Sequence, residues 1–389
     1  MSDDPVAGYT STGSKRPEAL FGALDDRWTP PARMVRAMGC RVWDAQGREY
    51  LDYIMGLGAV ALGYGHAEVA RAAIEAVSHG VVGPLAPVLE EELAADLRRL
   101  MPWVEQVRFL KSGAEACAAA VRLARVATGR ELVLGCGYHG WLDWCEGGAG
   151  VPASTRALFA ELPFNDVDGT RRVLAQAGDR LACVILEPVV VREPAAEWLA
   201  LVRAETERHG ALLIVDEIKT AFRLAVGGGT ERYGLRPDLV VLGKAIANGF
   251  PLAAVGGRRE VMAGVSRTWI SSTLATELVS LAAARATLGV IQRDGVPARL
   301  RTLGGRLLEG LELLARRHPD RVAGVAGVPE MCFLQFPDEA ASRTLARGAA
   351  DRGVLFKRSA YNFVSAAHDT SVIDRTLGVL GEVLAGRTG

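Results

Sequence analysis

The sequence has no net charge, no long apolar run and no export signal. Its 45 lysine and arginine residues balance 45 acidic residues over a length of 389. We therefore expect neither nucleic acid nor an anionic membrane surface as a partner. Charged residues interrupt every apolar stretch before it reaches the roughly 18 residues that a membrane span needs. Because the N-terminus is polar and does not resemble a secretion signal, we expect a cytoplasmic protein.

CxxC pairs and several metal-binding and catalytic motifs are also missing. The six cysteines form no CxxC pair, and the six histidines show no HExxH spacing. This pattern predicts reduced, mostly buried thiols and no metal site. No GxGxxG opens a helix after a predicted strand, and there is no GxSxG or Walker lysine motif. Dinucleotide-binding oxidoreductases, serine hydrolases and nucleotide hydrolases are therefore disfavoured.

The middle of the chain alternates short apolar runs with helical stretches. Continuous apolar strands separated by helices indicate a parallel sheet that is covered on both faces. A long helix over Val296–Arg317, a strand over Val325–Phe336 and further short elements indicate a smaller α+β unit at the end of the chain. The strands predicted for the parallel sheet are Val107–Leu110, Glu131–Leu134, Leu181–Leu186, Ala211–Val215 and Asp238–Leu242.

Small residues follow the first of these strands, at the start of a predicted helix. In open parallel sheets, ligands bind beyond the carboxyl ends of the strands. Ser112, Gly113 and Ala114 would expose backbone amides at a helix N-terminus, where the helix dipole favours an anion such as phosphate. Ser112 also fits a capping box with Glu115, which is the ordinary structural interpretation.

The next strands lead to an aromatic ring and to carboxylates. Tyr138 lies in the glycine-rich segment 135–140, where its ring could stack on a flat ligand. Glu187 follows the third strand. Asp216 comes directly after five apolar residues, and a carboxylate so close to the core requires a partner. That partner would be either a protonated ring nitrogen or a structural arginine such as Arg223.

Lys244 follows the fifth strand in strongly apolar surroundings, and the chain has few lysines. Such surroundings lower the pKa of an amine and make its neutral form available as a nucleophile or base, although a lysine that extends to solvent would fit as well. A phosphate cradle, a stacking ring, a carboxylate and an amine together fit pyridoxal 5′-phosphate (PLP). If Asp216 keeps the ring nitrogen protonated, Lys244 can carry a proton between the substrate Cα and the cofactor, which gives transamination.

The segments that carry these residues resemble the class III aminotransferases of the fold-type I PLP enzymes, in the branch that contains glutamate-1-semialdehyde aminomutase. The most specific segment, residues 212–257, reads LLIVDEIKTAFRLAVGGGTERYGLRPDLVVLGKAIANGFPLAAVGG. The resemblance implies an α/β large domain, in which helices sandwich a mostly parallel seven-stranded sheet, and a smaller α+β domain. We expect residues 61–285 to form the large PLP-binding domain and 286–389 the small domain, to which 1–60 contribute.

The resemblance also implies a role for each matching residue. Lys244 would be the Schiff-base lysine, and Asp216 would pair with the pyridine nitrogen. Tyr138 and Ile218 would pack on opposite faces of the ring. A homodimer with shared active sites is implied, because one loop would reach the phosphate of the neighbouring subunit. The remaining cofactor contacts would come from Ser112, Gly113, Ala114, Glu187 and, on that loop, Thr273.

The loop after Thr273 departs from the aminomutase pattern, because it reads Ala-Thr-Glu at 275–277 where that enzyme usually has Gly-Asn-Pro. We therefore expect an aminotransferase that moves an amino group from an amino acid donor to an aldehyde or ketone of a small metabolite, such as an amino-sugar or aminocyclitol intermediate in biosynthesis. The alternative is a PLP-dependent isomerase, either a 1,2-aminomutase of the glutamate-1-semialdehyde type or an epimerase. Candidates for binding a substrate carboxylate are Arg33, Arg36 and Arg223.

Overall fold

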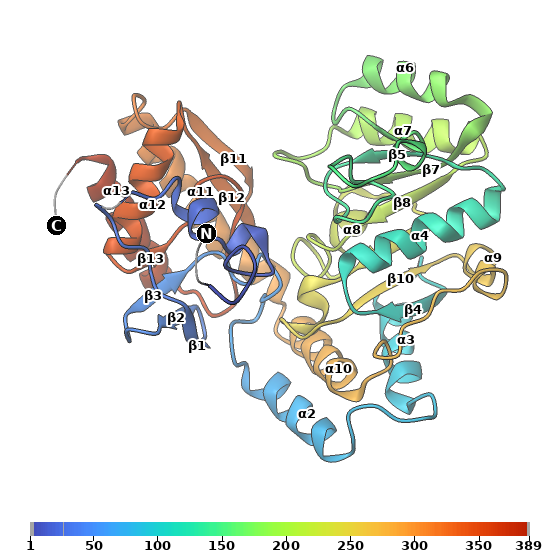
Figure 1. Cartoon of the computed structure of the whole chain (residues 1–389), viewed down its shortest axis with the longest axis horizontal. Coiled ribbons are helices and arrows are strands. Elements are labelled where there is room, and N and C mark those ends of the chain that lie inside the picture. Colours follow the sequence, from blue (N-terminus) through green and yellow to red (C-terminus); the bar gives the residue numbers. More distant parts are fainter. Residues whose placement is uncertain (1–3, 26, 387–389) are drawn as a thin grey trace. The chain divides into compact units, whose positions relative to one another are not determined.

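The computed structural model describes residues 4–25 and 27–386 and divides the chain into two compact units (Figure 1). Unit 1 comprises the described parts of Met1–His66 and Arg299–Gly389, and unit 2 is Ala67–Ala298. The expected small domain began at residue 286. In the structure, residues 286–298 belong to unit 2, where they end helix α10 and begin helix α11.

Unit 2 is built on a seven-stranded sheet with the strand order β4-β10-β9-β8-β7-β5-β6. Strand β10 pairs antiparallel with both of its neighbours, whereas the pairs among β5 to β9 are parallel. The predicted mostly parallel sheet is therefore confirmed. Its strands are β4 (Gln106–Leu110), β5 (Leu132–Cys136), β6 (Phe159–Glu161), β7 (Leu181–Leu186), β8 (Leu212–Asp216), β9 (Leu239–Leu242) and β10 (Ala253–Gly257).

The central strands of this sheet are apolar because both of their faces are covered. Every residue of β5, β7, β9 and β10 is buried, and successive side chains of a strand point to opposite faces. Helix α4 (Gly113–Thr128) packs its buried alanines and Leu123 against the sheet, and α7 (Ala196–Arg208) packs on β7 and β8. This rigid platform fixes the positions of the loops that follow the strands.

Unit 2 contains further helical elements besides α4 and α7. None of the described helices combines the length and apolar character that a membrane crossing requires. The helical elements are α2 (Ala67–Ser78), α3 (Val88–Leu100), α5 (Ala153–Arg156), α6 (Val167–Ala177), η2 (Gly178–Arg180), α8 (Gly228–Tyr233), η3 (Lys244–Ala247), α9 (Arg259–Met262), η4 (Ala263–Ser266), α10 (Leu278–Arg293) and α11 (Val296–Arg317), the last of which continues into unit 1.

Unit 1 is an α+β structure with two small sheets, ordered β1-β2-β3-β13 and β11-β12-β14. The single strand predicted over Val325–Phe336 is wrong. The segment forms the antiparallel hairpin β11–β12, which turns at Pro329 and Glu330. The elements are η1 (Gly13–Lys15), α1 (Pro17–Phe21), β1 (Met34–Met38), β2 (Arg41–Asp44), β3 (Glu49–Asp52), β11 (Gly324–Val328), β12 (Met331–Gln335), α12 (Glu339–Asp351), β13 (Val354–Leu355), β14 (Asn362–Phe363) and α13 (Thr370–Leu384).

Candidate active site

The carboxyl ends of three adjacent strands bring the chemically active residues to one edge of the sheet in unit 2. Asp216 is the last residue of β8, Glu187 directly follows β7, and Lys244 follows β9 after one glycine. Strand β8 lies between β7 and β9, and its end is in register with both. Because parallel strands end at a common edge, the structure groups these two carboxylates and the amine there.

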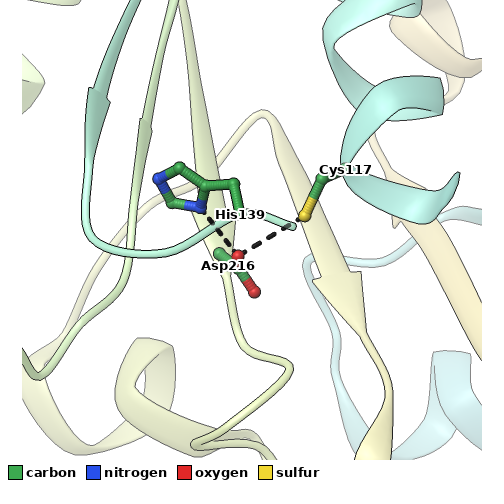
Figure 2. Close-up of side chains that lie close together, drawn as sticks. All are labelled: Cys117, His139 and Asp216. Carbon is green, nitrogen blue, oxygen red and sulfur yellow. Dashed lines mark hydrogen bonds and ion pairs between the residues drawn. The ribbon is translucent and has the colours of Figure 1, made fainter. Parts of the chain in front are cut away.

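Asp216 is almost completely buried, with 1% of its surface exposed, and it accepts three hydrogen bonds. Figure 2 shows the two from His139 and Cys117. Its Oδ2 atom lies 2.8 Å from His139 Nδ1, and the Cys117 thiol donates to the same oxygen at 3.4 Å. The Ile218 amide donates to Oδ1 at 3.1 Å. The sequence had suggested Arg223 as a partner of Asp216, and the structure places His139 against this carboxylate.

His139 is the most direct contact of Asp216 that sequence reasoning did not assign. Because an ionised carboxylate only accepts hydrogen bonds, its Nδ1 carries the proton in this contact. The imidazole stacks on Trp144 with 6.3 Å between the ring centres. The other ring nitrogen, Nε2, is buried and has no hydrogen-bond partner within the described chain. The histidine was visible in the glycine-rich segment, but nothing in the sequence linked it to a carboxylate on another strand.

Cys117, on α4, is the second contact that the sequence did not reveal. Together with His139 and Asp216 it places three potential metal-ligand atoms within 4.8 Å of one another. However, burial and the neighbouring Asp216 carboxylate raise the pKa of the Cys117 thiol well above its usual value. Metals bind the thiolate form. The protonated thiol and the hydrogen bonds already made to Asp216 therefore favour a hydrogen-bonded cluster over a metal centre.

Lys244 begins η3 beside three buried apolar residues, and its backbone has the unusual φ of 46°. Desolvation lowers the pKa of its amine, and the positive charges of Lys219 and Arg223 act in the same direction. The negative charges of Glu187 and Asp216 oppose this shift without cancelling it. The residue keeps some exposed surface. Its lowered pKa makes the neutral form of the amine more available than that of an ordinary lysine at the same pH. These are the properties of a nucleophilic lysine.

Glu187 forms an ion pair with Lys219, another residue that the sequence reasoning did not use. Glu187 Oε2 and Lys219 Nζ are 2.6 Å apart, and their side chains are only 7% and 12% exposed. The contact of Glu187 with a cofactor stays a prediction, since its carboxylate is already engaged by the amine.

The start of α4 combines a helix cap with a tight backbone approach. Ser112 accepts a hydrogen bond from the Glu115 amide, and the Glu115 carboxylate accepts one from the Ser112 amide at 2.8 Å, so the capping box exists. A Cβ on Gly113 would lie 2.7 Å from the Ile218 side chain. The amides of Gly113 and Ala114 begin the helix and therefore have no partner inside it. Their binding of a phosphate group stays a prediction that this geometry permits.

Tyr138 lies on a segment that packs on the start of α4, and Ile218 lies against Gly113 in the same part of unit 2. Their packing on opposite faces of a ring stays a prediction. A Cβ on Gly140 would lie 2.6 Å from Ala114, so the segment that carries Tyr138 packs on the start of α4. The Tyr138 side chain is 67% exposed and thus available for contact. Thr273 lies on an exposed turn before α10, and within one chain no contact joins it to Asp216 or Lys244 among the residues described.

A cavity of about 330 Å³ lies against the segment 135–140. Its lining includes Tyr138 and His139 but neither Lys244 nor Asp216, so it lies beside the reactive groups and not over the amine. The other lining residues come from the polypeptide after this segment and from the β6 and β7 loops, including Cys145, Glu146, Phe159, Glu161, Phe164 and Val190.

The arginines considered as carboxylate binders have structural contacts of their own. In unit 1, Arg33 pairs with Asp4 at 2.6 Å, and the Arg36 guanidinium stacks on Trp43. Arg223, in unit 2, is fully buried. No site for a substrate carboxylate follows from these positions.

Similarity to known proteins agrees with this geometry. The family described as Aminotransferase class-III matches residues 24–378. A glutamate-1-semialdehyde 2,1-aminomutase of Thermomicrobium roseum is 37% identical, over 98% of this chain and 96% of the relative. The PLP internal aldimine form of the Sphingopyxis FumI protein has a TM-score of 0.87 at 26% identity, covering 96% of this chain and 94% of that one. A β-phenylalanine aminotransferase from Variovorax paradoxus has a TM-score of 0.84 at 27% identity, with 99% and 95% covered.

The family match spans most of the chain, and the relatives cover nearly all of it. Their shared fold contains the seven-stranded sheet whose edge groups Glu187, Asp216 and Lys244. The chain therefore belongs to the class III aminotransferases, which are fold-type I enzymes that use pyridoxal 5′-phosphate.

Proposed function

We propose that this protein moves an amino group on a small molecule, with Lys244 as the residue that bonds the PLP aldehyde and Asp216 as the partner of the ring nitrogen. The observation that carries the proposal is a buried carboxylate, hydrogen-bonded by His139 and Cys117, at the same sheet edge as an amine whose pKa is lowered. A buried carboxylate held in this way is suited to a protonated ring nitrogen.

When bound, PLP supplies an electron-accepting ring and an aldehyde that condenses with amines. Asp216 would hold a proton on the ring nitrogen, and the neutral Lys244 amine would take up and return the proton at the substrate Cα. Tyr138 and Ile218 would hold the ring from its two sides. The phosphate would rest on the amides at the start of α4, through Ser112, Gly113 and Ala114.

Two outcomes of this chemistry are open to the chain, and different observations favour them. The names of the relatives favour a 1,2-aminomutase, which returns the amino group to the same carbon skeleton. Intermolecular transamination, the expectation from the sequence, is supported by the loop at 275–277. There Glu277 caps α10 and pairs with Lys111 at 2.6 Å, in place of the Gly-Asn-Pro that the aminomutase usually has. The isomerase outcome has the stronger support.

The proposed assembly is a homodimer in which both subunits contribute residues to each active site. Its proposed location is the cytoplasm. Thr273, the residue expected to reach the neighbouring phosphate, lies between Trp269 and Leu274, which are 81% and 53% exposed. Large apolar side chains so exposed on one segment are typical of a protein interface. A second subunit that covers them would bring Thr273 toward the other cofactor.

The experiment measures whether the amino group stays on the same carbon skeleton or passes to another molecule. The purified protein is incubated with PLP and then, separately, with glutamate and with glutamate 1-semialdehyde. An aminomutase converts the semialdehyde to its isomer and releases no keto acid, whereas an aminotransferase releases 2-oxoglutarate from glutamate and requires a carbonyl acceptor. A protein that binds no PLP, or whose Lys244→Ala variant retains full activity, would disprove the proposal.

A further inference from the structure

Two lysines, not one, lie near the ends of β8 and β9. Lys219 follows Asp216 by three residues, and Lys244 follows β9. The segments that carry them pack together, because a Cβ on Gly243 would lie 3.4 Å from the Ile218 side chain. A cofactor aldehyde at this edge therefore has two neighbouring primary amines as candidates for the covalent bond.

The two amines differ in their partners. Lys219 Nζ lies 2.6 Å from Glu187 Oε2, and both side chains are largely buried. A carboxylate at this distance stabilises the ammonium form of a lysine. No hydrogen bond or ion pair to Lys244 Nζ is found within the described chain, and burial together with the Lys219 charge lowers its pKa.

Glu187 is itself held in position by the neighbouring strand and segment. Its backbone amide donates to the Cys136 carbonyl at 3.0 Å. Gly137 has a φ of 109°, and a Cβ there would lie 2.8 Å from Glu187 Cγ. The backbone of this segment therefore packs directly on the Glu187 side chain, whose carboxylate engages Lys219. An ion pair between fixed and largely buried groups is held more firmly than one at the surface.

We propose that Glu187 keeps Lys219 protonated and thereby reserves the cofactor aldehyde for Lys244. The inference rests on the proposed function. In the bonding step, a neutral amine adds its lone pair to the aldehyde carbon, and loss of one water molecule leaves a carbon–nitrogen double bond. An ammonium has no lone pair to add. Glu187 is therefore a positioning residue that acts through Lys219, and the Lys219 charge in turn favours the neutral Lys244 amine.

The proposal is tested by locating the covalent bond in the protein loaded with PLP. Borohydride reduces the carbon–nitrogen double bond to a stable amine, and digestion with mass spectrometry then shows which lysine carries the pyridoxyl group. In the unsubstituted protein we expect the label on Lys244. Glu187→Gln removes the carboxylate charge beside Lys219, which should lower the pKa of the Lys219 amine by about one to three units. The neutral fraction of Lys219 then rises about tenfold or more, and its label should rise above background by about the same factor.

The matched control is Glu193→Gln. Glu193 accepts a hydrogen bond from the Tyr233 hydroxyl at 3.2 Å and is exposed. This variant removes an equal charge from the same loop region without touching the ion pair, so its label should stay on Lys244.

A second pair of variants removes the competition between the amines. In the Lys244→Ala protein, the pyridoxyl label on Lys219 should stay close to background. In the double variant Lys244→Ala with Glu187→Gln, Lys219 should become labelled, and the visible absorbance should return. Equal labelling of Lys219 in the Lys244→Ala protein and in the double variant would overturn the proposal. The proposal would also be overturned if Lys219 stayed unlabelled in the folded Glu187→Gln single and double variants. Absence of label on Lys244 in the unsubstituted protein would instead refute the proposed function.

An independent measurement applies if Glu187→Gln does not fold. The charged groups that act on Lys244 are Lys219, Glu187, Asp216 and Arg223. Replacing Lys219 with Met removes a positive charge, so the pH midpoint of the visible band of the loaded protein should move upward. A midpoint that stays unchanged or moves downward would contradict the role given to Lys219.

Discussion

At the scale of single residues, the site depends on how one buried oxygen is hydrogen-bonded. Asp216 Oδ2 accepts from both His139 and Cys117, so two donors hold the carboxylate that would face the cofactor nitrogen. Sequence reasoning found Asp216 because an apolar run ends there. It missed Cys117, since a cysteine in an alanine-rich helix gives no sign of a partner on another strand.

Replacing Cys117 with Ala should weaken cofactor binding, because Asp216 loses one donor and is positioned less firmly. The loss of one such hydrogen bond is worth about 1 kcal/mol, or roughly a fivefold rise in the dissociation constant of PLP. Cys117→Ser retains a donor and should restore the affinity. Titration of the apoprotein with PLP, followed by absorbance, measures both variants. Equal affinities for the Ala and Ser variants would contradict this role.

The lowered pKa of Lys244 predicts a pH-dependent cost to the stability of the PLP-free protein. Between the lowered pKa and the ordinary value of 10.5, the unfolded chain binds a proton that the folded chain does not. The free energy of unfolding therefore rises with pH through this window. Lys244→Met should be more stable than the unsubstituted protein at pH 7, and this advantage should shrink as the pH approaches 10.5. Urea unfolding at several pH values tests it; an advantage independent of pH would count against it.

At the scale of elements, the sequence revealed several buried strands of the large sheet but missed others. The apolar runs of β7, β8 and β9 were visible because both faces of these strands are covered. Strand β10 was missed because it consists mostly of alanine and glycine, whose small side chains give no strand pattern. The hairpin β11–β12 was taken for one strand, since its Pro329–Glu330 turn lacks the glycine or asparagine that usually marks a hairpin.

The small residues of β10 are required by close packing within the sheet. A Cβ on Gly257 would lie 2.3 Å from the Asp238 carbonyl oxygen, and backbone cannot yield as a flexible side chain does. Gly257→Ala should lower the free energy of unfolding by about 1 to 3 kcal/mol. Gly289→Ala in α10 is the control, because nothing lies within 4 Å of its Cβ and alanine favours helix. Urea unfolding of both variants should separate them, and similar stabilities would refute the packing argument.

At the scale of the whole molecule, the fold class followed from the alternation of strands and helices, and the family from the motifs around Asp216 and Lys244. The assembly could not be derived in this way, since a pattern within one chain does not define its contacts with a second copy. What the structure adds is an exposed apolar segment around Thr273 that includes Trp269 and Leu274.

Replacing Leu274 with Asp should therefore weaken the proposed dimer and, through Thr273, the retention of PLP. Light scattering measures the mass, and dialysis followed by absorbance measures the bound cofactor. The surface replacement Leu313→Asp on α11, at a residue 41% exposed, serves as the comparison and should leave both properties unchanged. A Leu274→Asp protein that stays dimeric and keeps its cofactor would argue against a shared site.

The imidazole that supports Asp216 has one bonded and one unbonded nitrogen, both enclosed by protein. That asymmetry makes His139 an internal probe. In protein enriched with nitrogen-15, its two ring resonances should be separated, because one nitrogen is hydrogen-bonded to Asp216 and the other has no partner in the described chain. Any event that moves a proton onto the carboxylate would alter this separation, so the resonance pair would report the electrostatic state of the centre without an added dye.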